Sequence, residues 1–200
     1  WWYISNGMVD FSHNGVEKNS NGWWRIENGK VNFSFEGFAS NSNGWWYLEG
    51  GKVTFQKNDV IKGTVDGETT WWHVVNSKVT YDTTVAQNAN GWWRIEEGKV
   101  NFNFTGIASN KNGTWYLDGG KVDFSYSGFY KNGTDYLYVE NGQITYTKND
   151  VIKGAVAAQS GWWHVVGSKV IFDTTVAKNS NGWWYISNGM VDFSHNGVEK

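Results

Sequence analysis

Seven pairs of adjacent tryptophans offer the most distinctive chemistry of this sequence, and the residue two positions after the first Trp of each pair is always aromatic or Arg. Flat rings stack against the CH face of a sugar, and neighbouring polar groups bond its hydroxyls. The pattern therefore predicts a row of sugar-binding side chains: Trp1, Tyr3, Trp23, Arg25, Trp45, Tyr47, Trp71, His73, Trp92, Arg94, Tyr116, Trp162, His164, Trp183 and Tyr185. In an alternative interpretation, the same rings only pack one repeat against the next.

The four histidines do not have the spacing of a metal site. His13 and His195 occupy the same position in two copies of one segment, as do His73 and His164 in two copies of another. No second His, Cys or paired carboxylate stands at ligand spacing from any of them. We therefore expect neither a metal nor a cofactor.

The carboxylates do not form a recognisable catalytic set. Asp59, Asp82, Asp150 and Asp173 recur with the repeats, and an Asp in a turn usually bonds its own backbone. Glycoside cleavage needs two carboxylates in a concave pocket, which a repetitive rod does not supply. No Gly-x-Ser-x-Gly motif, phosphate-binding loop or Cys nucleophile is present. We therefore expect a protein that is not an enzyme.

Residues 21–33, which read NGWWRIENGKVNF, indicate the element that positions the Trp pairs. Asn28-Gly29 supplies the two positive-φ residues of a type I′ turn, and the flanking residues alternate as in a half-buried strand. The sequence therefore predicts a β-hairpin with Trp24 and Phe33 on its inner face. The same parity assigns these tryptophans to the inner face: Trp2, Trp24, Trp46, Trp72, Trp93, Trp115, Trp163 and Trp184.

This hairpin is repeated along the whole chain. The units are 1–22, 23–44, 45–70, 71–91, 92–113, 114–135, 136–161, 162–182 and a partial unit 183–200. Four units form a longer repeat, 1–91 and 92–182, in which the insertion at 57–63 returns at 148–154. A single hairpin is too small to be stable alone. We therefore expect an all-β fold, a β-solenoid of stacked hairpins of 20–26 residues that forms an extended rod.

Two further features concern how the hairpins are joined and how far the array extends. The segments at 17–22 and 40–44 are rich in Asn, Ser and Gly, so we predict that they are linkers that cross between hairpins. Residues 183–200 repeat residues 1–18 without a change. Such identity within a diverged array favours a segment that was cut, with overlap, from a longer array.

The composition excludes several classes of protein. Aromatic residues make up 18% of a chain that has 25 Gly and neither Pro nor Cys, which suits many tight turns and excludes a disulfide scaffold. The formal net charge is −2 without a basic block, so nucleic acid is a poor partner. No run of 18 apolar residues is present, so we expect no membrane span.

The repeat resembles that of the choline-binding and glucan-binding cell-wall proteins of bacterial surfaces, whose unit reads broadly G-W-x-x-x-x-G-x-W-Y-Y-[F/L]-x-x-x-G-x-M. Residues 22–26 and 44–48 match its W-Y-Y-F strand, and Gly29 and Gly51 match its turn glycine. The resemblance covers all 200 residues. It implies a β-solenoid of stacked hairpins on the surface of a bacterium, usually a Gram-positive one.

One position departs from that family. The Trp of its G-W pair, which belongs to its choline cage, is replaced here by mostly aliphatic residues: Val16, Phe38, Val85, Ile107, Phe129 and Val176. An aliphatic side chain offers no π face to a quaternary ammonium. We therefore expect the fold to be shared and the ligand to be a polysaccharide rather than choline.

Together these observations predict a non-catalytic, extracellular repeat module at the bacterial cell surface that binds cell-wall or other extracellular polysaccharide. Many weak sites on one chain would supply its strength. Two alternatives stay open: a structural spacer or self-associating stalk, which the identical terminal segments favour, and a designed or consensus repeat. Apolar hairpin faces at the two ends of the array also predict head-to-tail self-association.

Overall fold

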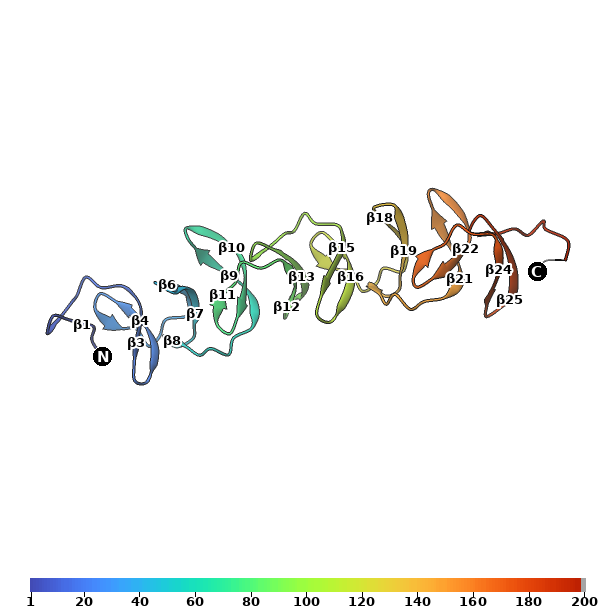
Figure 1. Cartoon of the computed structure of the whole chain (residues 1–200). Helices are drawn as coiled ribbons and strands as arrows, with labels where there is room; N and C mark the ends of the chain where they lie inside the picture. The colour runs from blue at the N-terminus through green and yellow to red at the C-terminus, as the bar shows by residue number, and fades with distance from the viewer. Residues whose placement is uncertain (199–200) are drawn as a thin grey trace. The chain divides into compact units, whose positions relative to one another are not determined.

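The structure is a computed structural model that describes residues 1–198, and this part of the chain contains strands and loops but no helix. No membrane-crossing helix exists within the described residues. The chain divides into two compact units, Trp1–Phe102 (unit 1) and Asn103–Lys200 (unit 2). Antiparallel hairpins in open sheets follow one another within each unit (Figure 1), so the predicted all-β fold of stacked hairpins is confirmed.

Most strands of unit 1 are short. They are β1 (Ile4–Ser5), β2 (Met8–Val9), β3 (Gly15–Asn19), β4 (Gly22–Glu27), β5 (Lys30–Val31), β6 (Gly37–Asn41), β7 (Gly44–Leu48), β8 (Lys52–Val53), β9 (Asp59–Val65), β10 (Glu68–Val75), β11 (Lys78–Val79), β12 (Thr84–Asn88), β13 (Gly91–Glu96) and β14 (Lys99–Val100).

The strands of unit 2 repeat the order of β3 to β14. They are β15 (Gly106–Asn110), β16 (Gly113–Asp118), β17 (Lys121–Val122), β18 (Gly128–Asn132), β19 (Asp135–Val139), β20 (Gln143–Ile144), β21 (Asp150–Val156), β22 (Gln159–Val166), β23 (Lys169–Val170), β24 (Thr175–Asn179), β25 (Gly182–Ser187) and β26 (Met190–Val191).

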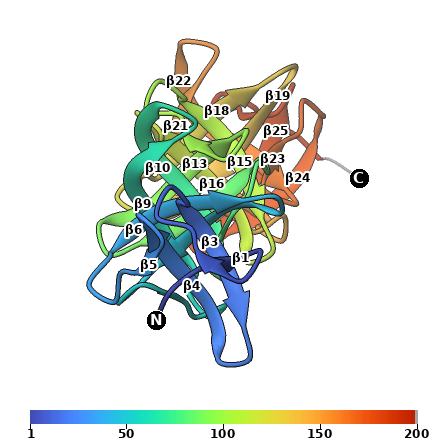
Figure 2. The same cartoon turned by 90° about the vertical axis from the view of Figure 1, so that its left-hand side faces the viewer.

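From β3 onward, each repeat has three strands, and its central strand carries the Trp pair except in β16, which has Thr114-Trp115, and β19, which has Tyr136-Leu137. The predicted Asn-Gly hairpin is present: β4 pairs with β5, with Asn28 and Gly29 at φ 48° and 72°. The prediction of linkers was wrong, because the polar segment before each Trp pair is itself a strand. β3 pairs with β4 from Gly15↔Ile26 to Asn19↔Gly22. Figure 2, which brings this end of unit 1 to the front, shows β3 and β4 side by side.

The two 26-residue repeats are longer because this first hairpin is extended. β9 and β10 pair from Val65↔Glu68 to Asp59↔Val74, and β21 and β22 pair in the same way. The insertions noted at 57–63 and 148–154 therefore lengthen a hairpin and leave the short hairpin that follows it intact.

The turn of each short hairpin docks on the backbone of the preceding repeat. The Gly29 N–H donates to the His13 carbonyl over 2.9 Å, and the Gly29 carbonyl accepts from the Tyr3 N–H over 2.8 Å. A Cβ at Gly29 would overlap the carbonyl oxygen of Asp10. In a long repeat, Ser77 occupies the turn position that Gly29 has here. Ser77 is fully buried, and its N–H donates to the Lys57 carbonyl over 2.7 Å. The turn is thus the joint that stacks the hairpins.

Small apolar clusters lie at each step between hairpins. Val16, Leu48 and Val53 are at most 1% exposed and pack with Trp46. Val156, Val165 and Val170 form the equivalent cluster with Trp163 in unit 2. The core is therefore distributed along the array, and its largest side chains are the tryptophans.

Candidate functional site

The second Trp of each pair is held in a fixed orientation by its position and its indole N–H. Trp46, Trp72, Trp115 and Trp163 are 3–9% exposed, which fits the inner face assigned to them from the sequence. The Trp46 indole donates to the Asn41 side chain over 3.0 Å, whereas Trp72 and Trp163 donate to backbone carbonyls over 3.2 Å. Of the other tryptophans assigned to this face, Trp24, Trp93 and Trp184 are only partly buried, and Trp2 is 53% exposed.

Three aromatic rings from two successive repeats, those of Trp1, Trp24 and Phe33, form one cluster. The ring centroids of Trp1 and Trp24 are 5.0 Å apart, those of Trp24 and Phe33 are 5.5 Å apart, and those of Trp1 and Phe33 are 5.6 Å apart. The prediction that Phe33 faces inward was wrong: it is 50% exposed. The strand β5 ends at Val31, so the alternation of faces does not extend to residue 33.

The same aromatic cluster recurs at other steps. Trp23, Trp46 and Phe55 have centroid distances of 5.2, 5.5 and 5.7 Å. In unit 2, Phe172 lies 6.0 Å from Trp163 and 6.4 Å from Tyr136. A Phe or Tyr stands nine residues after every inner-face position, from Phe11 to Phe193. This spacing was visible in the sequence, but its meaning depended on the fold.

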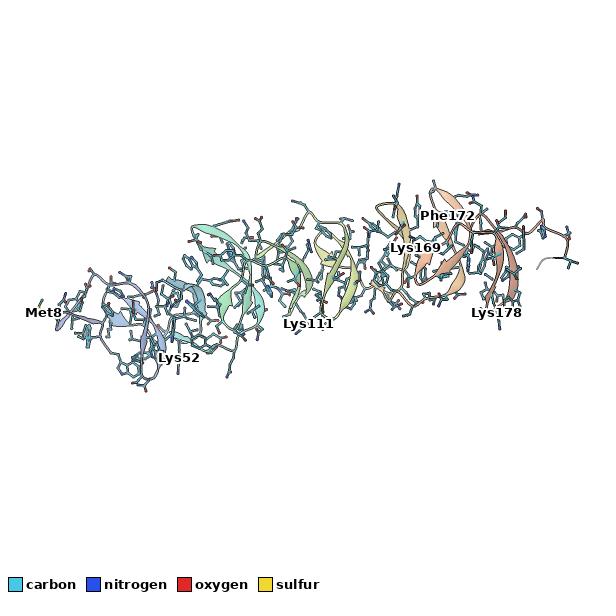
Figure 3. The ribbon with its side chains drawn as sticks, viewed as in Figure 1. Met8, Lys52, Lys111, Lys169, Phe172 and Lys178 are labelled. Atoms are coloured by element: carbon cyan, nitrogen blue, oxygen red, sulfur yellow. The ribbon has the colours of Figure 1, made fainter. Side chains whose placement is uncertain are left out.

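A lysine from the following hairpin lies over the inner Trp in unit 1. Lys52 is the direct cross-strand partner of Trp24, and its ammonium lies 5.0 Å from the ring centroid. Such distances fall within the range of cation–π attraction. The equivalent pairs are Lys30 with Trp2 at 5.4 Å, Lys78 with Trp46 at 5.4 Å and Lys99 with Trp72 at 5.8 Å. Figure 3 labels Lys52 among the side chains of this unit.

The glycine before the Trp pair makes room for the lysine stem. A Cβ at Gly22 would lie 2.7 Å from Cε of Lys52, and a Cβ at Gly44 would lie 3.3 Å from Cε of Lys78. Both glycines also have φ values in the region that other residues rarely adopt, 137° and 119°. Glycine at this position therefore positions the lysine against the ring.

The predicted ligand row divides into two groups in the structure. Its tryptophans pack on the next repeat: Trp23 belongs to the cluster with Trp46, while Trp71 and Trp162 pack against buried aliphatic clusters. Trp1 and Trp183 are the most open, at 49% and 69% exposed. Trp45 donates its indole N–H to Asp66 over 2.9 Å. Trp92 is likewise the first Trp of its pair.

The polar and aromatic partners in that row contact other parts of their own chain. Arg25 and Arg94 form ion pairs with the Glu two residues later, at 3.2 and 3.0 Å. The remaining contacts are stacking of Tyr3 on His13, of Tyr116 on Tyr126 and of Tyr185 on His195, and hydrogen bonds from Tyr47 to Glu36 and between His164 and Asp173. Their use in ligand binding stays a prediction.

Two of these contacts shift a pKa. Burial, with the hydrogen bond that Tyr47 donates to Glu36, raises the pKa of Tyr47 to about 12. Burial acts to raise the pKa of Asp82, but hydrogen bonds with His73 and Thr80, each 2.8 Å long, outweigh it and lower that pKa. Both groups are therefore tied into the framework.

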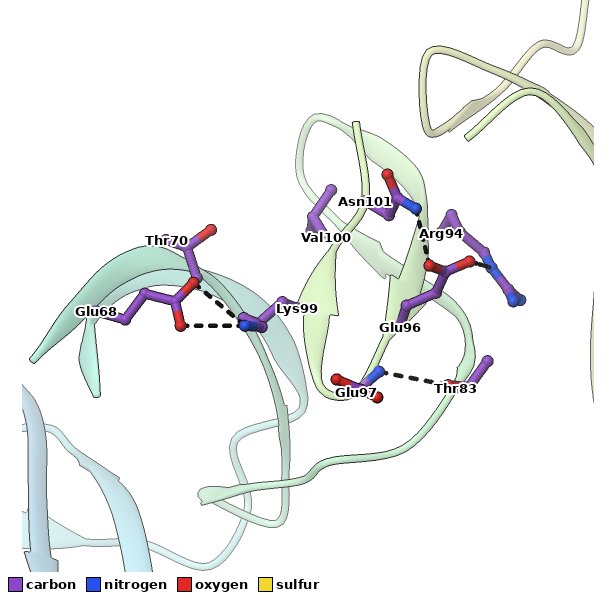
Figure 4. Close-up of a pocket in the computed structure, with 9 residues that line it drawn as sticks. All are labelled: Glu68, Thr70, Thr83, Arg94, Glu96, Glu97, Lys99, Val100 and Asn101. Carbon is purple, nitrogen blue, oxygen red and sulfur yellow. Dashed lines mark hydrogen bonds and ion pairs between the residues drawn. The ribbon is translucent and has the colours of Figure 1, made fainter. Parts of the chain in front are cut away.

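A surface hollow of about 540 Å³ lies beside Lys99 in unit 1. Figure 4 shows several of its polar groups paired within the chain: Lys99 with Glu68 at 3.1 Å, and Glu96 with Arg94 and Asn101 at 3.0 and 2.8 Å. In residues 1–198, no three His, Cys, Asp or Glu side chains come together as a metal site would require.

Comparison with known proteins identifies the family. The sequence model of the choline-binding repeat matches residues 1–10, 12–32, 34–54, 62–80, 81–101, 103–123, 125–145 and 172–192. These matches span most of the chain, so the chain belongs to the choline-binding repeat family, as the sequence resemblance implied. No curated protein sequence matches it.

Three solved structures are similar to this chain. CbpJ from Streptococcus pneumoniae TIGR4 is 18% identical with a TM-score of 0.37, over 91% of this chain and 60% of that one. CbpF in complex with ipratropium is 18% identical with a TM-score of 0.36, over 93% of this chain and 62% of that one. Alternansucrase in complex with isomaltononaose is 13% identical with a TM-score of 0.31, over 92% of this chain and 15% of that one.

Proposed function

We propose that this chain is a non-catalytic binding module that attaches to a cell-surface polysaccharide bearing choline, at the exterior of a bacterium. The proposed sites lie among the aromatic clusters between successive hairpins. Membership of the choline-binding repeat family supports the class of ligand. The proposal revises the expectation that the ligand would be a polysaccharide without choline.

The observation that carries the proposal is the ammonium group 5.0 Å from the Trp24 ring, within a cluster completed by Trp1 and Phe33. A Trp face attracts ammonium and quaternary ammonium groups by the same electrostatics, and aromatic cages are a common way to bind choline. The aliphatic residue at Val16 does not remove this capacity, because the rings of this cluster come from other positions.

Direct stacking of sugar rings is the second candidate. Exposed aromatic faces favour it: Phe33, Phe102, Phe124 and Phe172 are 47–51% exposed, and exposed flat rings suit the CH faces of sugars. A spacer without a ligand would need only the packing contacts of the same rings. Choline dependence separates the three possibilities.

The test is retention of the intact chain on a matrix that carries choline. We expect retention, elution by free choline chloride and no elution by ethanolamine at the same concentration, because ethanolamine lacks the methyl groups that contact the rings. Passage through the choline matrix with binding to a choline-free polysaccharide would instead support sugar stacking. Failure to bind either would favour the spacer.

A further inference from the structure

The residue opposite each inner Trp differs along the chain, and its charge follows no single rule. It is Lys opposite Trp24, Trp46 and Trp72 in unit 1. In unit 2 the neutral residues Gln143 and Met190 stand opposite Trp115 and Trp163. The aromatic rings are thus repeated more regularly than the cation that accompanies them.

We propose that these lysines act as built-in cations that fill the clusters of unit 1, and that an external quaternary ammonium enters where the opposite residue is neutral, at the cluster of Tyr136, Trp163 and Phe172. This inference rests on the proposed function and makes the residue opposite the inner Trp a determinant of ligand occupancy. A choline-binding repeat then need not be a choline site.

Electrostatics supports exclusion from the lysine-filled clusters. The Lys52 ammonium already lies 5.0 Å from the Trp24 ring, so a second cation at the same cluster would lie within several ångströms of it. Like charges at such separations repel each other even at a protein surface. An external choline would also have to displace a contact that the chain holds at high effective concentration.

The Trp163 cluster has the rings without the opposing charge. Met190 packs on this cluster, and a thioether is neutral and adapts its shape readily. Met190 takes the place that the lysine has in unit 1, because a Cβ at Gly161 would overlap its Sδ, and Trp163 itself is 4% exposed. Phe172, which is 51% exposed and labelled in Figure 3, is therefore the open ring at which an external cation would enter, by displacing the Met190 thioether. Lys131 lies 6.0 Å from the neighbouring Tyr136 ring, at the outer limit of cation–π contact.

A neighbouring step has the lysine without the ring. Leu137 replaces the inner Trp there and Lys169 is its cross-strand partner. With no Trp face available, the Lys169 ammonium pairs with Asp135 at 2.7 Å.

A reciprocal exchange tests the proposal in the intact chain by calorimetric titration with choline chloride. Lys52→Met copies the Met190 environment onto Trp24 and should add one choline site. Met190→Lys should remove one site or weaken it by about ten-fold, the factor expected for one modest cation–π contact. Lys111→Met removes a charge at an exposed turn and should change neither number. Lys52→Gln provides a second opening variant, and circular dichroism checks that each variant is folded.

The outcomes are distinguishable. A gain with Lys52→Met and a loss with Met190→Lys support the proposal. Equal choline stoichiometry and affinity in all variants would overturn it while leaving choline binding established. Absence of choline binding in every variant would overturn the proposed function, and this inference with it. Without choline, the ring current of Trp24 should shift the NMR signals of the Lys52 ε-methylene protons upfield. Unshifted signals would overturn the proposal that Lys52 fills this cluster.

Discussion

At the scale of single residues, the two tryptophans of a pair carry out different tasks. Trp46 is 7% exposed and packs with Val16, Leu48 and Val53, whereas Trp45 is only partly buried at the edge of another cluster. Removal of a large buried ring costs both transfer free energy and a cavity. In this pair, the second ring therefore contributes more to stability.

Trp46→Ala should lower the free energy of unfolding by about 3–5 kcal/mol, as expected for a large aromatic ring in a core. Trp45→Ala should cost clearly less, because part of that ring is already in contact with water. Urea denaturation of both variants checks this. Equal losses of stability would contradict the assignment of inner and outer faces.

Tyr47 gives a test that depends on pH. The unfolded phenol ionises near its ordinary value of 10.0, whereas the folded Tyr47 keeps its proton up to about pH 12. Between these values the unfolded state binds fewer protons, so stability falls as the pH rises. Tyr47→Phe should make this alkaline loss of stability smaller. An identical slope in urea titrations of the two proteins from pH 9.5 to 12 would contradict the raised pKa.

At the scale of elements, the turn of the short hairpin controls stacking. Gly98 donates its N–H to the Asp82 carbonyl over 2.9 Å and accepts from the His73 N–H over 2.8 Å. A Cβ at Gly98 would overlap the Thr80 carbonyl oxygen, whereas a Cβ at Gly7 would meet nothing within 4 Å. Both glycines have nearly the same φ, 78° and 79°. Substitutions at these two glycines therefore distinguish the cost of backbone strain, which both share, from the cost of disturbing the contact with the preceding repeat, which only Gly98 makes.

Gly7→Ala should cost about 1–2 kcal/mol, from the left-handed backbone alone. Gly98→Ala should cost about 3–4 kcal/mol, because the overlap with the preceding repeat adds to that strain. Thermal or urea unfolding of each variant measures the difference. If the two substitutions were equally costly, the turn would not be the joint between hairpins.

The sequence allowed the elements to be predicted wherever the signal was local. Asn28-Gly29 requires two positive φ values and encodes its turn directly, and alternation along β7 separated the buried Trp46 from the partly buried Trp45 correctly. The strand β3 was mistaken for a linker because Asn and Ser are more common in turns than in strands. Phe33 was placed inward because the end of β5 at Val31 has no local mark.

At the scale of the whole molecule, the aromatic clusters depend on contacts that no local pattern records. Lys52 meets Trp24 through the pairing of β8 with β4, which belong to different repeats. Rings at a nine-residue spacing were present in the sequence, but only the stacking of hairpins brings Trp1, Trp24 and Phe33 together. Family membership followed from the repeat, whereas the place of the cation required the register between repeats.

The most direct test of this account is to follow the indole N–H signals of the intact chain by NMR during a titration with choline chloride. The signals would be assigned by single Trp→Phe substitutions. We predict that the signal of Trp163 moves in a saturable manner, while those of Trp24, Trp46 and Trp72, under their lysines, stay in place. If no inner-face indole signal moves, the aromatic clusters do not bind choline and the account is wrong.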